Sequence, residues 1–348
     1  MTTTLAAVDL QSAIARMPKV ELHRHLEGAV RFETLAAVVA QADADLPRSV
    51  TALRALVQVQ TGQPRTAQNF LSKFDVLRQV YRSPAAIQRV VGEVIEDAAR
   101  DGVWYLELHF TPAALVSVRG YALREAFDWV VEATRRAEER TGIQVRLIPS
   151  VNRHESVDLA ERVVELAATF RGCVLGVGLA GNEAEFPAEP FRAVLAEARQ
   201  SGLGVTIHAG EWAGADSVAE AVERLGADRI SHGVRVMEDP NVVALARERN
   251  VVFETCLTSN VHSGVVPRIE DHPLGAMIDA GLRVTVNTDD PTISAITLSD
   301  EYRTAVESLG LSLHSLPGLV LAAAQGSFLA DKEKAGLERA LTSALLAE

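Results

Sequence analysis

Four short motifs in this sequence place histidine or carboxylate side chains where metal chemistry would need them. His23 and His25 stand two residues apart, and further histidines begin the motifs HAGE (208–211) and HGVRV (232–236). The fourth motif, NTDDP (287–291), carries two adjacent aspartates. Imidazole nitrogens and carboxylate oxygens are common zinc ligands in proteins. The set therefore indicates a zinc site with further acidic groups beside it.

Each motif taken alone has an ordinary explanation. Residues two apart on a strand point to the same side, so His23 and His25 could share one ion, although most such pairs are surface or packing residues. Gly28, just beyond them, permits a close turn of the backbone. Asp289 and Asp290 repel each other and are costly to bury without a cation, although such pairs more often cap a helix. The case for a metal rests on the motifs occurring together.

The elements that must position these residues alternate between strands and helices along the chain. Short apolar runs separated by longer helical patterns predict a parallel α/β architecture, and eight such runs fit a closed (β/α)8 TIM barrel. The predicted strands are 19–25, 103–110, 143–151, 174–180, 203–208, 229–232, 251–256 and 282–288. The four motifs lie at the ends of the first, fifth, sixth and eighth strands. Active sites of such barrels lie at the carboxyl ends of the strands, so the motifs are expected to converge there.

A long helical stretch separates the first two predicted strands. Residues 30–100 have helical patterns throughout, including 67–81 and 84–100. No linker rich in serine or glycine divides the chain. We therefore expect a single domain over residues 1–348, in which residues 30–100 form a helical insertion after strand 1 that acts as a lid over the site.

The alternation within strands predicts which side chains face the barrel interior. On the first strand, Glu21, His23 and His25 should share one face. On the second strand, Glu107 and His109 also share a face, and we expect them to form a structural hydrogen-bonded pair.

Composition excludes several classes of partner. The chain has 34 basic and 46 acidic residues and a formal net charge of −12. Such a chain, without a basic stripe, is a poor partner for nucleic acid or an anionic membrane. Its start lacks the pattern of a secretory signal, and no run of about 18 apolar residues could form a membrane helix. Cys173 and Cys256 make neither a disulfide framework nor a metal knuckle. We expect a soluble, cytoplasmic protein that binds neither nucleic acid nor membrane.

As a set, the motifs resemble those of the adenosine deaminase family. The matching segments are MPKVELHRHLEG (17–28), GLAGNE (178–183), HAGE (208–211), SHGVRV (231–236), TSN (258–260) and VNTDDP (286–291). They span almost the whole chain in the family's order and spacing. The resemblance implies a (β/α)8 barrel that uses one zinc ion (Zn2+) per chain to hydrolyse the 6-amino group of a small-molecule purine substrate.

The resemblance also implies a role for each motif residue. The implied zinc ligands are His23, His25, His208 and Asp289. The implied catalytic trio is Glu211, which protonates purine N1, with His232 and Asp290 orienting the attacking water and His232 stabilising or accepting its proton. The implied substrate contacts are His25, Glu27, Gly181 and Asp290, together with two lid aromatics, Phe70 and Phe74.

Two positions depart from the family's usual pattern and bear on the substrate. Glu27 stands where adenosine enzymes usually carry an aspartate that contacts the ribose, and a glutamate occurs there in adenine-directed relatives. Asn182 stands where an acidic residue is common. We expect deamination of adenosine and deoxyadenosine, with adenine and 6-aminodeoxyfutalosine as alternative substrates.

Other classes of protein fit the sequence less well. A two-metal hydrolase would often need a bridging lysine, and none stands at a predicted strand end. A non-catalytic nucleoside-binding barrel would be expected to lack a ligand or the acid, whereas every expected group is present. The P-C-x-x-C motif of the cytidine deaminase type is absent.

Overall fold

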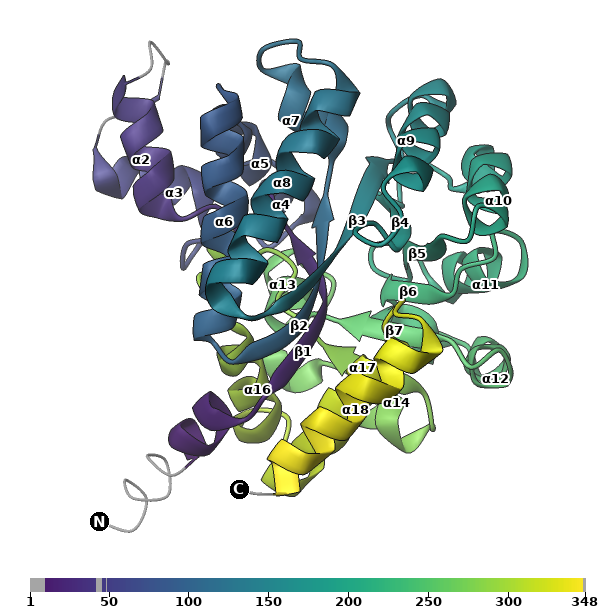
Figure 1. The fold of residues 1–348 in the computed structure, drawn as a ribbon. Helices are drawn as coiled ribbons and strands as arrows, with labels where there is room; N and C mark the ends of the chain where they lie inside the picture. Colours follow the sequence, from purple (N-terminus) through teal and green to yellow (C-terminus); the bar gives the residue numbers. More distant parts are fainter. Residues whose placement is uncertain (1–9, 42–45, 48, 347–348) are drawn as a thin grey trace, which may run out of the picture.

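The computed structural model describes residues 10–346, apart from 42–45 and 48. Eight parallel strands follow one another in the order β1 to β8 and form the wall of a barrel (Figure 1). Their bounds are β1 Lys19–His25, β2 Val103–Phe110, β3 Gln144–Asn152, β4 Gly176–Ala180, β5 Gly204–Ala209, β6 Arg229–His232, β7 Val252–Thr255 and β8 Arg283–Val286. The predicted (β/α)8 TIM barrel is confirmed.

Helices connect the strands and cover the outside of the barrel (Figure 1). After β2 the helices are α7 Pro112–Ser117, α8 Leu123–Thr141, α9 Val157–Thr169, α10 Arg192–Gln200, α11 Ala215–Glu223, α12 Pro240–Glu248, α13 Leu257–His262, α14 Leu274–Asp279, α15 Pro291–Ser294, α16 Leu298–Glu307, α17 Leu316–Gly326 and α18 Asp331–Leu346. Short 3-10 turns are η2 Glu189–Phe191, η3 Val234–Glu238, η4 Ile269–Asp271 and η5 Leu313–Ser315.

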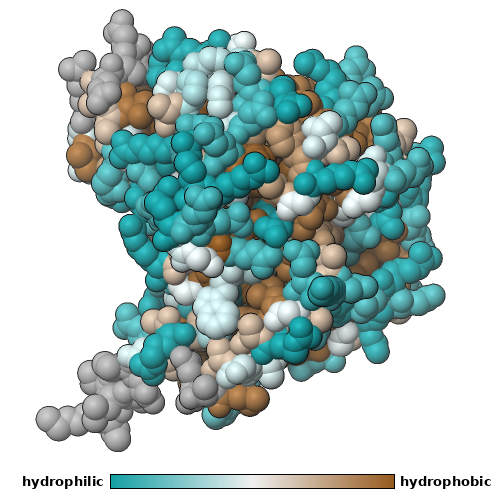
Figure 2. All heavy atoms as spheres, viewed as in Figure 1, coloured by the Kyte–Doolittle hydropathy of each residue, from teal (hydrophilic) through white to brown (hydrophobic). Residues whose placement is uncertain are grey.

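Helix α8 shows why these segments fold as they do. Phe127, Val130 and Thr134 recur at helical spacing on its buried face. The helix ends at Gly142, which adopts the left-handed conformation (φ 75°) that favours glycine. The face shown in Figure 2 is mostly hydrophilic, with hydrophobic residues visible in patches between the hydrophilic ones. None of the described helices is long and apolar enough to cross a membrane.

Between β1 and β2 the described residues form six elements. They are α2 Phe32–Gln41, α3 Val50–Val57, α4 Ala67–Leu71, α5 Lys73–Leu77, η1 Arg78–Val80 and α6 Pro84–Arg100. Helix α6 has the expected bounds and packs against α8 and β2. The helical pattern predicted over 67–81 corresponds to α4, α5 and η1, and α4 and α5 are separated at Ser72. There the hydroxyl of Ser72 donates to the carbonyl of Asn69 (2.8 Å), a side-chain bond that competes with helix continuation.

The barrel closes between β1 and β8 through the predicted metal ligands. The backbone N–H of Asp289 donates to the carbonyl of His23 (3.1 Å), and the N–H of His25 donates to the carbonyl of Asp289 (2.8 Å). The Asn287 side chain accepts from the N–H groups of Leu22 (2.9 Å) and His23 (3.2 Å). Closing the barrel therefore places the Asp289 carboxylate beside both histidines.

The prediction that Glu21 shares the inward face of β1 with His23 and His25 is wrong. The register between β1 and β2 shifts between Glu21 and Arg24, which breaks the two-residue alternation. The Glu21 carboxylate pairs with Arg24 (2.7 Å) and accepts from the N–H of Thr288 (2.9 Å). It contacts these residues, whereas His23 and His25 turn toward the site.

The expected pair between Glu107 and His109 is also wrong. The Glu107 carboxylate pairs with Arg229 (2.6 Å). The ring of His109 contacts the carbonyl of Leu22 through Nε2 (3.2 Å) and the hydroxyl of Ser150 through Nδ1 (3.3 Å). A fully buried arginine is the stronger partner for a buried carboxylate, because it carries a permanent charge.

An aromatic ring plugs the amino end of the barrel. The Arg229 guanidinium stacks over Phe328 at 3.6 Å from the ring centroid and pairs with Glu254 (2.5 Å). Phe328 occupies the space above Gly204, where a Cβ atom would lie 2.4 Å from the ring. Access to the interior is therefore from the carboxyl end.

Candidate active site

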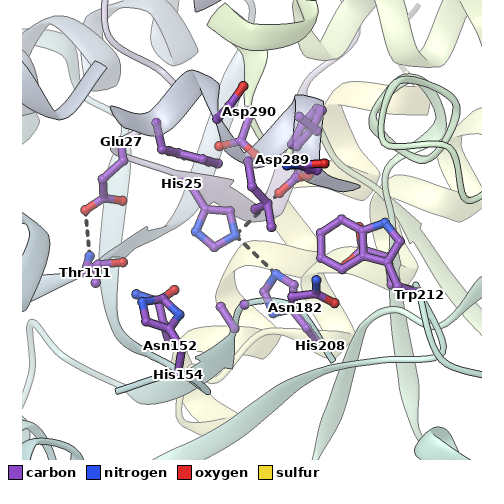
Figure 3. Close-up of a pocket in the computed structure, with 18 of the residues that line it drawn as sticks. His25, Glu27, Thr111, Asn152, His154, Asn182, His208, Trp212, Asp289 and Asp290 are labelled. Atoms are coloured by element: carbon purple, nitrogen blue, oxygen red, sulfur yellow. Dashed lines mark hydrogen bonds and ion pairs between the residues drawn. The ribbon is translucent and has the colours of Figure 1, made fainter. Parts of the chain in front are cut away.

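The side chains of His23, His25, His208 and Asp289 converge at the carboxyl ends of β1, β5 and β8, and Figure 3 shows the last three of them. The Nε2 atom of His25 lies 3.2 Å from Nε2 of His23 and 3.3 Å from Nε2 of His208. The Asp289 Oδ1 atom lies 3.1 Å from Nε2 of His23 and 3.4 Å from Nε2 of His25. Zinc binds nitrogen and oxygen at about 2.0–2.2 Å, so the edge of its tetrahedron is roughly 3.3–3.6 Å. The spacing of the predicted ligands fits one such ion.

Neighbouring groups orient these ligands. Nδ1 of His23 lies 2.9 Å from the Glu254 carboxylate, and Nδ1 of His208 lies 3.1 Å from the carbonyl of Leu179. Protons on Nδ1 leave the Nε2 lone pairs directed at the centre, as a metal ligand requires. Burial lowers the pKa of His23, but its hydrogen bonds to Asp289 and Glu254 outweigh this effect and raise the pKa to about 9. Without a metal, a proton is thus held where a cation would bind.

The remaining ligands have the ionisation states that a metal needs. Burial lowers the pKa of His25 to about 3 and that of His208 well below its usual value, so both rings are neutral at pH 7. Burial raises the pKa of Asp289, but the hydrogen bond from His23 and nearby imidazole charge hold it well below its usual range. The hydroxyl of Ser259 also donates to Oδ2 of Asp289 (2.6 Å).

Glu211 sits on the loop after β5, and a second glutamate fixes this loop. The Glu183 carboxylate accepts from the N–H groups of Gly210 (3.1 Å), Glu211 (2.5 Å) and Ala213 (2.8 Å). Gly210 takes a left-handed conformation (φ 66°) that turns the loop back over the site. Glu183 lies in the motif GLAGNE (178–183), but nothing in the sequence predicted that it holds this loop.

The Glu211 side chain is buried, and its surroundings favour the protonated carboxyl. Its pKa is raised well above the usual value, first by burial and then by the charges of Asp289 and Glu183, while Arg153 opposes the shift. Its Oε2 atom has no hydrogen-bond partner among the described residues and lies 3.7 Å from Nε2 of His232. A neutral carboxyl aimed into a cavity can donate a proton to a ligand.

Asp290 lies against Gly28. Burial, followed by the charges of Asp289 and Glu27, raises the pKa of Asp290 well above its usual value. Its Oδ1 atom has no partner among the described residues. A Cβ atom at position 28 would lie only 1.7 Å from that oxygen, so only glycine leaves room for the observed position of the carboxyl.

His232 ends β6 in an unusual backbone conformation. Its φ of 62° lies in the left-handed region, as does the φ of 61° at Asp289, and such strain in residues other than glycine concentrates at functional sites. Nε2 of His232 lies 4.0 Å from Oδ2 of Asp289, and its Nδ1 lies 3.1 Å from the side-chain amide of Asn260. Asn260 lies in the motif TSN (258–260), but nothing in the sequence predicted its contact with His232.

A cavity of about 710 Å3 opens above these groups. The predicted site residues that line it are His25, Glu27, Phe70, Phe74, Gly181, His208, Glu211, His232, Asp289 and Asp290. His23 lies beneath the cavity and is fully buried. The structure thus brings all eleven predicted residues to one place, including the two phenylalanines from the insertion.

The cavity extends away from the metal ligands on both sides. Glu27 accepts from the N–H of Thr111 (2.7 Å) on one side of His25, and Trp212 lies on the opposite side (Figure 3). Burial raises the pKa of Glu27. Asn182, the other departure from the family pattern, lines the cavity and accepts from the N–H of Ala184 (3.1 Å).

Comparison with known proteins agrees with this geometry. The sequence model of the family described as adenosine deaminase matches residues 18–344. The adenosine deaminase of Enterococcus faecalis is 35% identical to this chain over 337 residues, which cover 97% of this chain and 99% of that protein. This similarity confirms the resemblance found in the motifs.

Solved structures share the fold. Adenine deaminase from Arthrobacter aurescens is 30% identical (TM-score 0.86; 94% of this chain and 98% of that one). An amidohydrolase from Burkholderia ambifaria with bound zinc is 30% identical (TM-score 0.85; 97% and 95%). The N6-methyl-AMP deaminase of Arabidopsis thaliana is 28% identical (TM-score 0.86; 97% and 100%). The chain belongs to the adenosine deaminase family of enzymes, which hydrolyse the C–N bond of a cyclic amidine.

Proposed function

We propose that this enzyme hydrolyses adenosine and deoxyadenosine to inosine and deoxyinosine, releasing ammonia, with one zinc ion per chain. The observation that carries the proposal is the convergence of three imidazoles and one carboxylate at tetrahedral spacing, directly beside the neutral carboxyl of Glu211. The three imidazoles and the carboxylate suit a metal ion that activates water for hydrolysis. Glu211 supplies the acid that protonates the purine ring.

The proposed metal ligands are His23, His25, His208 and Asp289. A zinc ion held there would supply a nucleophilic water at neutral pH by lowering the pKa of that water. The zinc-bound relative from Burkholderia ambifaria supports this choice of metal.

The chain's own residues then direct the reaction. Glu211 donates its proton to N1 of the purine, which makes C6 electron-poor. His232, with Nε2 between the carboxylates of Glu211 and Asp289, orients the incoming water toward C6. Asp290 faces the ring and can hydrogen-bond N7. Addition of water at C6 gives a tetrahedral carbon, and loss of the protonated 6-amino group as ammonia restores the purine as its 6-oxo form.

The extent of the cavity favours a nucleoside over a free base. Beyond the metal ligands it is lined by Phe70, Phe74 and Arg78 of the insertion. A free base bound near the metal would leave this outer part empty, whereas a ribose would extend into it. We propose that these residues are part of a lid that closes over the sugar.

The charges around the cavity favour a neutral substrate. Glu27, Asp75 and Glu185 line it, whereas Arg78 is the only lysine or arginine that lines the cavity in the described part of the chain. A nucleotide phosphate would meet this mostly acidic lining at a cost in Coulomb energy. The mostly acidic lining therefore supports a nucleoside substrate over a nucleotide such as N6-methyl-AMP, for which the Arabidopsis relative is named.

Free adenine is the second candidate because of Glu27. Its side chain is buried and fixed by Thr111, and the relative from Arthrobacter aurescens is an adenine deaminase. If Glu27 fills the ribose position, the wild type will ignore adenosine and Glu27→Asp could newly admit it. Under the adenosine proposal, Glu27→Asp keeps kcat/KM for adenosine within about tenfold, or ~1.4 kcal/mol.

The test is ammonia release from a panel of purines, with metal content measured on the same preparation. The panel holds adenosine, deoxyadenosine, adenine, 6-aminodeoxyfutalosine and N6-methyl-AMP, with methylamine assayed for the last. The proposal expects the highest kcat/KM for adenosine or deoxyadenosine. A preparation that deaminates adenine far faster than adenosine would overturn the substrate while leaving the deaminase chemistry intact.

A further inference from the structure

A chain of hydrogen bonds runs from a backbone amide to His232 through two buried side chains. The N–H of Leu274, the first residue of α14, donates to Nδ1 of His272 (3.2 Å). Nε2 of His272 lies 3.2 Å from Oδ1 of Asn260. The amide nitrogen of Asn260 lies 3.1 Å from Nδ1 of His232. His272 is 5% exposed and Asn260 is fully buried, so water does not compete for these bonds.

The backbone N–H fixes the direction of every bond in this chain. A backbone N–H can only donate, so Nδ1 of His272 must accept. A neutral imidazole has one protonated nitrogen, which places the proton of His272 on Nε2, from which it donates to Asn260. The side-chain amide of Asn260 therefore turns its NH2 group toward His232. Nδ1 of His232 must accept, and the His232 proton lies on Nε2.

We propose that Asn260 and His272 are positioning residues that lock His232 in the tautomer carrying its proton on Nε2, the nitrogen that faces Glu211 and Asp289. The inference rests on the proposed role of His232. In this tautomer Nε2 donates a hydrogen bond to the attacking water and has no lone pair with which to remove its proton. His232 then acts by orienting the water through its N–H group, and the proton of the water must pass through another group to the 6-amino group that leaves as ammonia.

Two further observations support a dedicated role for this part of the fold. Helix α13 carries Asn260 and also Ser259, whose hydroxyl donates to Asp289 (2.6 Å). One short helix thus orients both His232 and the proposed carboxylate ligand. Neither Asn260 nor His272 lines the cavity, so their effect on substrate must pass through His232.

The tautomer itself can be measured without any assay of activity. In the zinc-loaded full-length protein labelled with 15N at its histidine rings, a neutral ring gives widely separated shifts for its protonated and bare nitrogens. His232→Gln and His272→Gln identify the two signals among the nine histidines. The proposal expects His232 and His272 both to carry the proton on Nε2. A wild-type His232 protonated on Nδ1 would overturn it.

Matched variants of His272 test whether this chain of hydrogen bonds maintains the tautomer of His232. His272→Leu removes the donor to Asn260 and frees the amide to turn over, so the His232 signal should become a mixture of tautomers and kcat for adenosine should fall about tenfold with KM unchanged. His272→Gln keeps an N–H donor and should hold both the tautomer and kcat near wild type. Equal behaviour of the two variants would contradict the proposal.

The two readouts separate this inference from the proposed function. If the enzyme turns over none of the purines in the panel, the ring shifts still report the tautomer. If adenosine is deaminated but His232 shows the other tautomer, only the positioning role of Asn260 and His272 fails.

Discussion

Replacing Gly28 by alanine tests how closely Asp290 must be placed. Gly28 has no left-handed φ, so its backbone suits alanine, and the obstacle is the neighbouring carboxyl. A Cβ atom at position 28 would lie 1.7 Å from Oδ1, 2.4 Å from Cγ and 2.5 Å from Cβ of Asp290. Because Cβ of Asp290 is included, rotating its side chain cannot relieve the overlap, and the backbone must move as well.

The size of the displacement sets the expected loss. Ordinary contact begins at 3.4 Å, so the Asp290 oxygen must retreat by the difference between 3.4 and 1.7 Å, or 1.7 Å. A misplacement of about 1 Å in a reacting group can cost 10²-fold in rate. We expect Gly28→Ala to lower kcat/KM for adenosine by about 10²-fold or more, or ~2.7 kcal/mol of activation free energy.

Steady-state kinetics, zinc content and denaturant unfolding on one preparation separate the possible causes. The three atoms nearest to a Cβ at position 28 all belong to Asp290, which is not a proposed zinc ligand, so zinc should remain near one per chain. Gly336→Ala in α18, where a Cβ atom would meet nothing within 4 Å, is the matched control and should leave kcat/KM unchanged. A folded, zinc-loaded Gly28→Ala protein with kcat/KM within threefold of wild type would refute the reasoning.

Three other substitutions give distinct signatures. Glu211→Gln removes the transferable proton and should lower kcat about 10²-fold or more with zinc content unchanged, and near-normal turnover would discard its role as acid. Glu254→Gln weakens the support of His23 and should lower zinc affinity about 10- to 100-fold in chelator competition, and an unchanged affinity would contradict that role. Burial raises the pKa of Glu301 from 4.5 to about 7 despite the hydrogen bonds from Thr258, so the folded protein keeps a proton that the unfolded chain loses in this range. The stabilising contribution of Glu301 to the free energy of unfolding should therefore be greatest below about pH 4.5 and fall by up to about 3 kcal/mol by about pH 7. Glu301→Gln should lack this contribution, so the difference in unfolding free energy between wild type and variant should change between denaturant titrations at pH 5 and pH 7.5.

The barrel and the clustering of the proposed metal ligands could be predicted because each leaves a local signal in the sequence. The strands β1, β2 and β6 have the predicted bounds, since buried parallel strands form short apolar runs that turn residues punctuate. The histidines and aspartates at strand ends were informative because buried ionisable groups need compensation, and a shared cation provides it. A barrel then brings separate strand ends to one site.

The residues that hold the site in place could not be predicted in the same way. Glu183 holds the loop of Glu211 from a position 28 residues earlier in the sequence, and no periodicity links the two. Asn260 and His272 are single polar residues on short elements, whose partners depend on packing. The shift at Glu21 also has no sequence signal, because a strand with an irregular register reads like a regular one.

The most direct test of the account is a zinc titration of the metal-free enzyme with adenosine as substrate. The four converging ligands predict that deamination is absent without metal and rises linearly with added zinc to a sharp break at one ion per chain. His208→Ala, which removes a proposed ligand, should abolish the break. Full adenosine turnover by a preparation shown to be free of metal, or a break at two ions per chain, would contradict the central claim.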